Sequence, residues 1–427
     1  MDIINIQIQV DGHRDVHIPK MAKARQLFNA PELKSTRKFT DQLNKFLSQI
    51  DLEGKQIALT AGSRGIVRIV EITRIIVEVL KNYGALPFIV PAMGSHGGAT
   101  ANGQTEVIAG YGITPDNVGC PIRSSMDTVT IGCLEDGMPI YCDRIAFESD
   151  GIVVINKIKP HADFKGDHES GLLKMMVVGL GNHNGASAIH SRGFEQMATI
   201  LLKAAGLILE AAPILFGVGI LENPCKQLLD LELVPSNTII QRDRELLILA
   251  KKYMPRLIMP KIDVLIVEEI GKNISGEGMD PNVTGRPGSG LLEGFEAPLI
   301  QKIVVLDITD ESHGNGVGIG MADISTIRCY HKINLSSMYT NAITASVLDP
   351  AKIPILANSD QEAIQLAIRT CNQSNPNECR VVRIKNTMEL QEIQVSEQVL
   401  RDMKDNPIFE QISLLEKMCF TPEGQLI

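Results

Sequence analysis

The sequence predicts an α/β protein: two α/β domains with parallel or mixed sheets flanked by helices, and an active site in the cleft between them. Three observations support this class. Apolar runs of strand length alternate with segments of helical periodicity. Loops rich in glycine follow several of the strands directly. The 427 residues suffice for two or three domains, each with its own core. Such alternation is typical of sheets with helices on their faces.

The first half of the chain contains a β–loop–α–β unit. Gln56–Thr60 is an apolar strand, and a tight loop of residues 61–65 follows it. Ile66–Tyr83 carries Ile, Val and Leu at helical spacing, and the strand Pro87–Val90 comes next. Gly151–Ile155 is a further strand. The other elements expected here are an edge strand over residues 3–10 and helices over residues 35–50, 102–111 and 194–211.

Prolines in residues 251–260 interrupt an apolar helix and suggest a domain boundary. We expect residues 1–258 to form an N-terminal α/β domain that binds the cofactor and carries catalysis. Residues 259–394 are expected to form a C-terminal α/β domain that closes over the substrate. Residues 395–427 contain a helical pattern that is expected to pack back on the first domain. The strands expected in the second domain are residues 263–267, 303–308, 353–357 and 380–385.

Composition excludes several classes of function. A net charge of −9 and a pI near 5.6, with no basic face, argue against nucleic-acid binding. No apolar run approaches the roughly 18 residues that a membrane helix requires. The first residues alternate like a strand and lack the pattern of a signal peptide. The 8 cysteines are scattered without a Cys-x-x-Cys pair, which favours a reducing cytoplasm.

The segment Asn156–Phe194 has the composition of a reaction centre. It holds four of the 9 histidines, and glycines recur along it. Neutral imidazole is a common metal ligand, and glycine allows the backbone to approach a ligand closely. Lys174 lies in the apolar run Leu172–Val178. A lysine in such a run either extends its amine to water or serves as a desolvated amine nucleophile.

Three loops that follow strands carry polar side chains. The loop of residues 61–65 offers Gly62, Ser63 and Arg64, which suit a phosphate, although a plain glycine turn is the alternative. His96 lies between glycines, and His161 follows Lys-Pro. Because ligands bind at the carboxyl ends of strands in such sheets, we expect the three loops to share one site. An alternative for each histidine is an ordinary turn position.

Other residues of this chemistry are less specific. His190 alone cannot form a metal site, so any metal here needs ligands from something other than side chains. Asp163 or Asp167 is placed to orient an imidazole, and the sequence does not choose between them. Lys272 or Arg286 is a candidate to hold a substrate carboxylate. Four further histidines have no assigned role: His168, His183, His313 and His331.

These pieces, in this order, resemble the lactate racemases that depend on a nickel-pincer nucleotide, together with their relatives that act on other 2-hydroxy acids. The resemblance covers essentially the whole chain and rests on five ordered pieces. They are the strand–loop–helix with Ser63-Arg64, the glycine-flanked His96, Lys-Pro-His161, Lys174 and His190.

The resemblance implies racemisation or epimerisation by reversible hydride transfer. It makes Lys174 the lysine joined to the cofactor, a pyridinium-3,5-bisthiocarboxylic acid mononucleotide carrying nickel, and His190 the nickel ligand. His96 and His161 become the paired acid/base residues, and Ser63 and Arg64 contact the cofactor phosphate. The implied partners are a small 2-hydroxy acid and the proteins that make the cofactor.

Two departures and two alternatives accompany this hypothesis. The stretch between His161 and Lys174 is longer than in the lactate enzymes. The loop Gly271–Arg286, which should meet the substrate, also differs from theirs and favours a larger or more polar 2-hydroxy acid. A zinc-dependent hydrolase or lyase with His96, His161 and His190 as direct ligands is one alternative. A non-catalytic binder of a phosphorylated ligand, using residues 61–65, is the other. The oligomeric state is left open.

Overall fold

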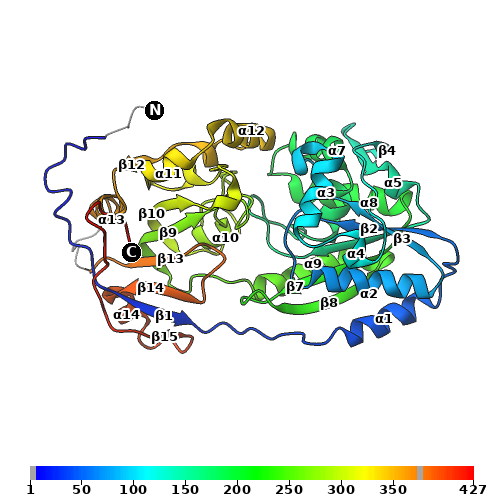
Figure 1. Cartoon of the computed structure of the whole chain (residues 1–427), viewed down its shortest axis with the longest axis horizontal. Helices are drawn as coiled ribbons and strands as arrows, with labels where there is room; N and C mark the ends of the chain where they lie inside the picture. The colour runs from blue at the N-terminus through cyan, green and yellow to red at the C-terminus, as the bar shows by residue number, and fades with distance from the viewer. Residues whose placement is uncertain (1–5, 373–377) are drawn as a thin grey trace. The chain divides into compact units, whose positions relative to one another are not determined.

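The computed structural model describes residues 6–372 and 378–427, which form two compact α/β units. Unit 2 is the continuous segment Ala30–Met254, and unit 1 combines the residues before Ala30 with Pro255–Ile427. Each unit has its own sheet flanked by helices (Figure 1). The α/β class predicted from the alternation of strands and helices is therefore confirmed.

Unit 2 is built on a five-stranded sheet with the order β3-β2-β6-β7-β8. The first four of these strands are parallel, and β8 runs antiparallel to β7. The strands are β2 (Gln56–Ala61), β3 (Leu86–Pro91), β6 (Gly151–Lys157), β7 (Ile214–Glu222) and β8 (Leu228–Pro235). A hairpin of β4 (Thr128–Cys133) and β5 (Pro139–Asp143) forms a separate two-stranded sheet.

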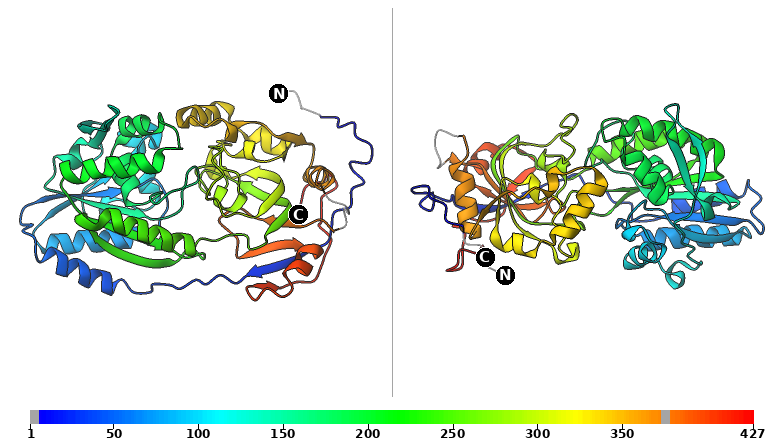
Figure 2. Two further views of the ribbon diagram at one scale, coloured as in Figure 1. Left: turned by 180° about the vertical axis from the view of Figure 1, so that it is seen from behind. Right: turned by 90° about the horizontal axis from the view of Figure 1, so that it is seen from above.

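Helices cover both faces of this sheet, as Figure 2 shows from two further directions. Successive strand residues point to opposite faces, so Ile57 and Leu59 join one core while Ala58 joins the other. The first core is completed by α1 (Arg37–Leu47), α2 (Ile69–Asn82) and α3 (Ala101–Gly110). The second is completed by α6 (Leu172–Lys174), α8 (Met197–Ala211) and α9 (Ile239–Lys252). The remaining helices of unit 2 are α4 (Pro115–Val118), α5 (Arg144–Phe147) and α7 (Asn182–His190).

Unit 1 contains an eight-stranded sheet with the order β12-β11-β10-β9-β13-β14-β1-β15. The strands from β12 to β13 are parallel, and the last three pair antiparallel. These strands are β1 (Met21–Gln26), β9 (Lys261–Ile270), β10 (Leu299–Ile308), β11 (Ile324–Thr326), β12 (Ile355–Ala357), β13 (Val381–Ile384), β14 (Glu392–Ser396) and β15 (Phe409–Gln411). The helices are α10 (Pro281–Thr284), α11 (Ile327–Lys332), α12 (Leu335–Ala345), α13 (Asp360–Arg369) and α14 (Glu397–Met403).

The two ends of the chain differ from the expected organisation. The domain boundary expected at residue 258 lies at Met254. The residues before Ala30, expected in the N-terminal domain, belong to unit 1 together with Pro255–Ile427. The expected helix over 395–427 is not found, because α14 is short and β15 pairs with β1. Of the edge strand expected over residues 3–10, residues 6–10 are not a strand and residues 3–5 lie outside the described residues. Antiparallel pairing between the two ends satisfies backbone groups that a helix packed elsewhere would leave at a sheet edge.

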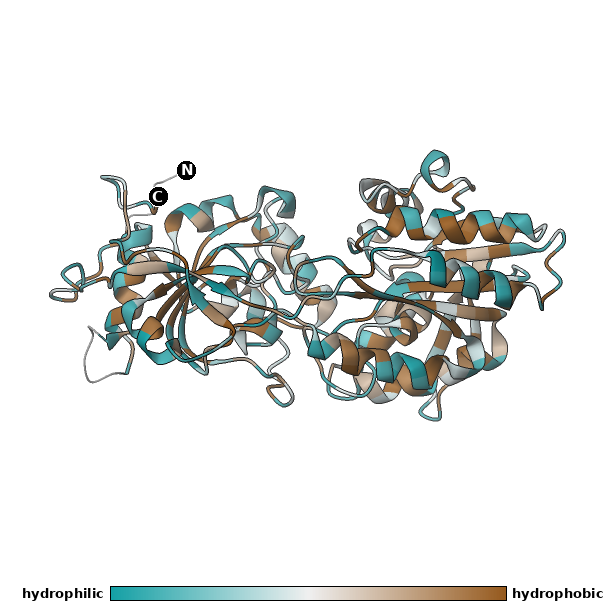
Figure 3. Cartoon of the chain, turned by 90° about the horizontal axis from the view of Figure 1, so that it is seen from below, coloured by the Kyte–Doolittle hydropathy of each residue, from teal (hydrophilic) through white to brown (hydrophobic). Residues whose placement is uncertain are grey.

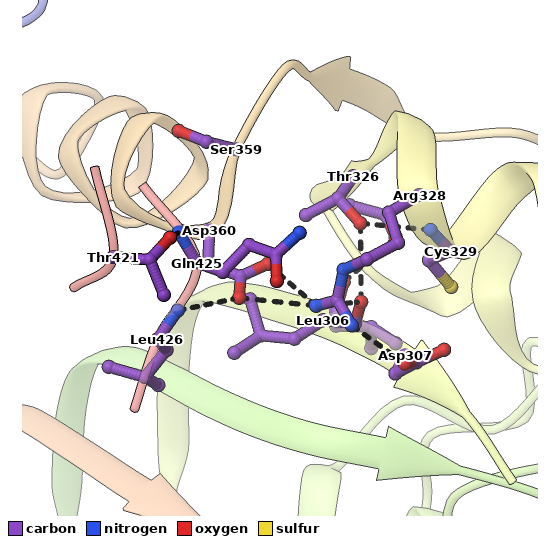
Figure 4. Close-up of polar contacts among 12 residues, drawn as sticks. Leu306, Asp307, Thr326, Arg328, Cys329, Ser359, Asp360, Thr421, Gln425 and Leu426 are labelled. Atoms are coloured by element: carbon purple, nitrogen blue, oxygen red, sulfur yellow. Dashed lines mark hydrogen bonds and ion pairs between the residues drawn. The ribbon is translucent and has the colours of Figure 1, made fainter. Parts of the chain in front are cut away.

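A charged cluster fixes the C-terminal segment to unit 1 (Figure 4). Arg328 on α11 donates to Asp307 at 2.8 Å and to Asp360 at 2.9 Å, which joins β10 to the first turn of α13. The backbone N–H of Leu426 donates to the same Asp360 at 2.9 Å. These contacts place the C-terminal segment on α13 within unit 1.

The hydropathy pattern follows this organisation. The strands of both sheets are largely apolar, and the helices carry apolar and polar residues on different sides (Figure 3). None of the helices in the described part of the chain is long and apolar enough to cross a bilayer.

Candidate active site

The carboxyl ends of β2, β3 and β6 in unit 2 carry the three loops that the sequence singled out. Ala61 pairs with Pro91 in register, and the N–H of Ala92 donates to the carbonyl of Ala61 at 2.8 Å. The N–H of Gly94 donates to the carbonyl of Gly179 at 3.2 Å. The loop after β3 therefore contacts the segment that follows Lys174. This is the edge of an open α/β sheet where ligands commonly bind.

Lys174 is the last residue of α6, and the next five residues, Met175–Gly179, form a π-helical turn. Its neighbours Leu172, Leu173 and Met176 are fully buried, while Lys174 is only partly exposed. π-Helical turns inside helices occur frequently at functional sites. The apolar run around Lys174 is thus a buried helical segment, and Lys174 is its one partly exposed charged residue.

Asp243 on α9 fixes the start of α6. Its carboxylate accepts a hydrogen bond from the N–H of Leu172 at 2.6 Å, and its other oxygen lies 3.0 Å from Nδ1 of His168. A Cβ added at Gly171 would lie 2.2 Å from the same carboxylate, so only glycine fits there. His168, which the sequence left without a role, is buried and holds the element that carries Lys174.

His161 follows β6 and contacts Lys174 directly. Nε2 of His161 lies within hydrogen-bonding distance of Nζ of Lys174. On the other side of the ring, Nδ1 accepts a hydrogen bond from the backbone N–H of Asp163 at 3.0 Å. The ring lies 4.3 Å from that of Phe164, measured between centroids. Both ring nitrogens of His161 therefore have partners, and one of them is the candidate lysine.

A buried carboxylate that the sequence did not single out supports this loop. Glu169 accepts from the backbone N–H of His161 at 2.7 Å and from that of Gly166 at 3.3 Å. The amines of Lys165 and Lys251 lie 3.4 and 2.6 Å from its oxygens. Sequence alone gave no signal, because a glutamate among charged residues usually lies at the surface.

The two aspartates proposed to orient an imidazole have different positions. Asp163 is buried, and one of its carboxylate oxygens lies 3.7 Å from Nδ1 of His161. Asp167 is exposed and pairs instead with Arg244 at 3.2 Å. Of the two aspartates, Asp163 is therefore the one placed to orient His161. Its backbone N–H donates to Nδ1, and its carboxylate lies near the same atom.

The electrostatic environment disfavours positive charge at the centre of the site. The pKa of the Lys174 amine falls from 10.5 to about 8, chiefly because the amine is buried. The Asp163 carboxylate opposes this fall in pKa, while the charges of Lys159 and Arg64 add to it. Burial and then the charge of Lys174 hold the pKa of His161 well below 6.5. The same two causes lower the pKa of His190 to about 4. Both histidines are neutral at physiological pH.

His96 lies on the loop after β3, beside the loop after β2. Nδ1 of His96 hydrogen-bonds with the hydroxyl of Ser63, and the imidazole is exposed. Gly97, with a φ of +66°, packs so closely that a Cβ would lie 2.5 Å from the backbone nitrogen of Gln104. Gly97 therefore serves backbone packing on α3 as well as backbone conformation.

The loop of residues 61–65 lies against the helical segment that carries Lys174. A Cβ at Gly62 would lie 3.0 Å from the terminal methyl group of Met175. Arg64 is exposed and its charge acts on Lys174. Beyond the loop, the N–H of Val67 donates at 2.9 Å to Glu222, which also pairs with Lys157 at the end of β6.

His190 ends α7 and lies near the ring of Phe194, with 5.9 Å between the ring centroids. The same phenylalanine ring lies 6.1 Å from that of His161. The structure thus groups His161 and His190 around one aromatic ring, with Lys174 against His161. Over residues 6–372 and 378–427, no three His, Cys, Asp or Glu side chains are grouped as a metal site.

The two substrate candidates of the second domain lie in unit 1. Nζ of Lys272 donates to the carbonyl of Gly276 at 2.5 Å. Arg286 pairs with Asp323 at 2.7 Å and donates to the carbonyl of Met321 at 3.0 Å. These contacts give Arg286 a structural role within unit 1, since it ties its loop to the segment before β11.

Comparison with known proteins gives the class of fold first. No protein-family model and no curated protein matches this sequence. Among solved structures, the chain is similar to a structural-genomics protein from Thermotoga maritima, with a TM-score of 0.51 and 13% identity over 85% of this chain and 99% of that chain. This similarity shows a shared fold and nothing about activity.

The chain is also similar to one enzyme of known structure, with a lower TM-score. The lactate racemase apoprotein from Thermoanaerobacterium thermosaccharolyticum aligns with 13% identity and a TM-score of 0.49, over 86% of this chain and 94% of that chain. A likeness at this TM-score carries no argument about function, so the case for an activity depends on the geometry of the site.

Proposed function

We propose that the protein is a racemase or epimerase of a 2-hydroxy acid that carries a nickel-pincer nucleotide on Lys174. The observation that supports this best is the contact of the partly buried Lys174 amine with His161, with His190 across the ring of Phe194. A lysine in this position has little structural use, since burying an ammonium costs free energy. It suits an amine that forms a covalent bond.

The residues present fit such a cofactor. With a pKa of about 8, an appreciable fraction of Lys174 is the free amine near neutral pH. His190, with a pKa of about 4, offers a neutral imidazole, which suits nickel. Ser63, Arg64 and the backbone of Gly62 would hold the phosphate. A single protein histidine is enough if the organic cofactor supplies the other ligands.

The two remaining histidines provide proton transfer. When bound, the nucleotide supplies an acceptor for the hydride on C2 of the substrate. One histidine takes the hydroxyl proton, and the other returns a proton to the oxygen when the opposite enantiomer forms. His161 is neutral at physiological pH. The hydrogen bond between Nδ1 of His96 and the Ser63 hydroxyl ties the orientation of this ring to the loop after β2.

The zinc alternative receives no support from this geometry. It requires His96, His161 and His190 as direct ligands, yet both ring nitrogens of His161 already have partners. No three-residue metal group is found among the described residues. The carrier alternative, which uses only residues 61–65, gives no reason for the grouping of Lys174 with two neutral histidines.

The test is a racemisation screen over a panel of 2-hydroxy acids, performed in D₂O with protein co-expressed with the cofactor's biosynthetic proteins. We expect interconversion of enantiomers of one substrate with C2 retaining its own hydrogen, and a loss of at least about a hundredfold for His96→Ala and His161→Ala. Deuterium at C2 would indicate proton abstraction instead. Undiminished binding of a phosphorylated ligand by both variants, without turnover of any substrate, would favour the carrier.

A further inference from the structure

The hydrogen bonds of His161 identify which of its nitrogens carries the proton. The group that faces Nδ1 is the backbone N–H of Asp163, at 3.0 Å. A peptide N–H is a donor and cannot accept, so Nδ1 must present its lone pair. In the neutral imidazole the single ring proton therefore lies on Nε2. The backbone N–H thus favours this tautomer while Lys174 is unmodified, because it lies nearer to Nδ1 than the Asp163 carboxylate oxygen, which is 3.7 Å away.

This tautomer determines the state of Lys174. Nε2–H is a donor, and the atom that faces it is Nζ of Lys174. An ammonium group has three donors and no acceptor, whereas a free amine has a lone pair. The contact is a hydrogen bond only if Lys174 is the free amine that accepts from Nε2–H. A proton added at Nδ1 would point at the Asp163 N–H, so the pair resists protonation.

Most of the charged groups around the pair are cationic, and two buried carboxylates, Asp163 and Glu169, lie beside it. Lys159 and Lys165 follow β6, and Arg64 lies after β2; all three are cationic and disfavour a further positive charge. His190 on α7 is neutral at physiological pH. The Asp163 carboxylate favours the ammonium form. Burial of the amine outweighs it, since the pKa of Lys174 falls to about 8.

We propose that His161 has a second role before any catalysis: its Nε2–H stabilises the free-base form of the Lys174 amine, which then attacks an acyl or thioacyl carbon. In that step the Nζ–C bond forms and the bond from carbon to its leaving group breaks. The amine proton departs with the leaving group as water, a thiol or an alcohol. No atom is oxidised or reduced. His161 is here a positioning residue for Lys174. Only the identity of the acyl group depends on the proposed function.

The tautomer is tested directly on the protein without added cofactor. Nitrogen-15 NMR of histidine-labelled protein distinguishes a ring protonated on Nε2 from one protonated on Nδ1, with His161→Gln used to assign the signal. We expect the Nε2–H tautomer, with the ring unprotonated, at about pH 9, above the Lys174 midpoint of about 8. The Nδ1–H tautomer at that pH, or an imidazolium, would overturn the proposal.

The consequence for Lys174 is tested by acetylation with p-nitrophenyl acetate, an acyl donor of the proposed class, followed by peptide mass spectrometry. The rate at Lys174 is measured against pH, with the exposed Lys45 as a reference in the same digest. We expect a midpoint near pH 8 for the wild-type protein. A midpoint no lower than that of Lys45 would contradict the proposal.

Two substitutions separate a hydrogen bond from simple burial. His161→Met fills a similar volume without a donor, and His161→Gln retains an N–H. If His161 only excluded water, methionine would leave the Lys174 midpoint unchanged or lower it. The proposal predicts a rise of at least about one pH unit for methionine and a smaller rise for glutamine. Equal midpoints in the three proteins would overturn the proposal. If neither variant folds, the NMR measurement on the wild-type protein decides whether the proposal holds.

These outcomes are distinct from those of the racemisation screen. Acetylation and NMR use protein without cofactor, so the absence of racemase activity leaves the tautomer assignment and the reactive amine in place. Conversely, racemisation together with an unreactive Lys174 would support the proposed function and reject the role of His161 in preparing the amine.

Discussion

At the scale of single residues, the candidate site is a group of side-chain nitrogen atoms whose surroundings disfavour positive charge. Lys174, His161 and His190 all have lowered pKa values, and burial is the largest cause for each. Such shifts reduce the stability of the folded protein, because the unfolded chain binds protons more readily than the folded one. Sites that carry this kind of cost are more often functional than structural.

Replacing Lys174 with methionine should therefore stabilise the protein near neutral pH. Below pH 8 the lysine is charged in both states, so the wild-type folded state carries the full cost of a buried charge. That cost is relieved between pH 8 and 10.5, where the unfolded chain binds more protons and stability rises with pH.

We expect Lys174→Met to add on the order of 1–3 kcal/mol to the free energy of unfolding at pH 7, measured in urea. The advantage should shrink as the pH approaches about 10.5. The exposed Lys45→Met is the control and should change stability little. A loss of stability in Lys174→Met at pH 7 would show that the amine is not penalised in the folded protein.

At the scale of elements, the position of Lys174 depends on α9. Asp243 accepts from Leu172 at the start of α6 and contacts the buried His168, so one carboxylate fixes both ends of the loop before Lys174. The sequence carried a signal for this. Asp243 lies on the same helical face as Ile239, Leu246 and Leu247, which are all buried. A charged residue on an apolar face suggests a buried partner.

Asp243→Ala should destabilise unit 2 by about 2–4 kcal/mol, because a backbone N–H and an imidazole lose their buried acceptor. The measurement is urea unfolding of the variant and the wild-type protein. Asp167→Ala is a matched control: its side chain is 65% exposed and pairs with Arg244 at the surface. We expect the control to change stability by less than about 0.5 kcal/mol. Equal effects for the two variants would remove the case for Asp243 as an anchor.

Local elements were largely predictable, whereas contacts between distant segments were not. The helix predicted over Ile66–Tyr83 is α2 (Ile69–Asn82), and the strand predicted over Gln56–Thr60 is β2 (Gln56–Ala61). Periodicity of apolar residues determines such elements locally. The pairing of β1 with β15 joins segments almost 400 residues apart, and no local pattern encodes it. The three strand-end loops were predictable because each follows an apolar strand and contains glycine, histidine or both.

At the scale of the whole molecule, the first and last parts of the chain complete one unit. β1 pairs with β14 on one side and with β15 on the other, and Met21 and Ala24 are buried in unit 1. Unit 2 is a continuous segment with its own two cores. The two units are therefore expected to respond separately when the chain is shortened.

A chain that starts at Ala30 should lose order in unit 1 alone. Without β1, β14 has no partner on that side and β15 loses the sheet, so unit 1 should exchange its amide hydrogens faster. Hydrogen exchange with mass spectrometry should show peptides of β13 and β14 losing roughly tenfold or more in protection. Peptides of β2, β3 and β6 should keep theirs. Equal loss across both units would contradict the division at Met254.

The most direct test of the proposed function is the mass and metal content of protein co-expressed with the cofactor's biosynthetic proteins. We expect peptide mass spectrometry to find a nucleotide-sized addition on Lys174 and metal analysis to find nickel at close to one equivalent per chain. Lys174→Arg keeps a cationic side chain and should lose the addition. An unmodified Lys174 in protein that racemises a 2-hydroxy acid, or an addition on another residue, would contradict the proposal.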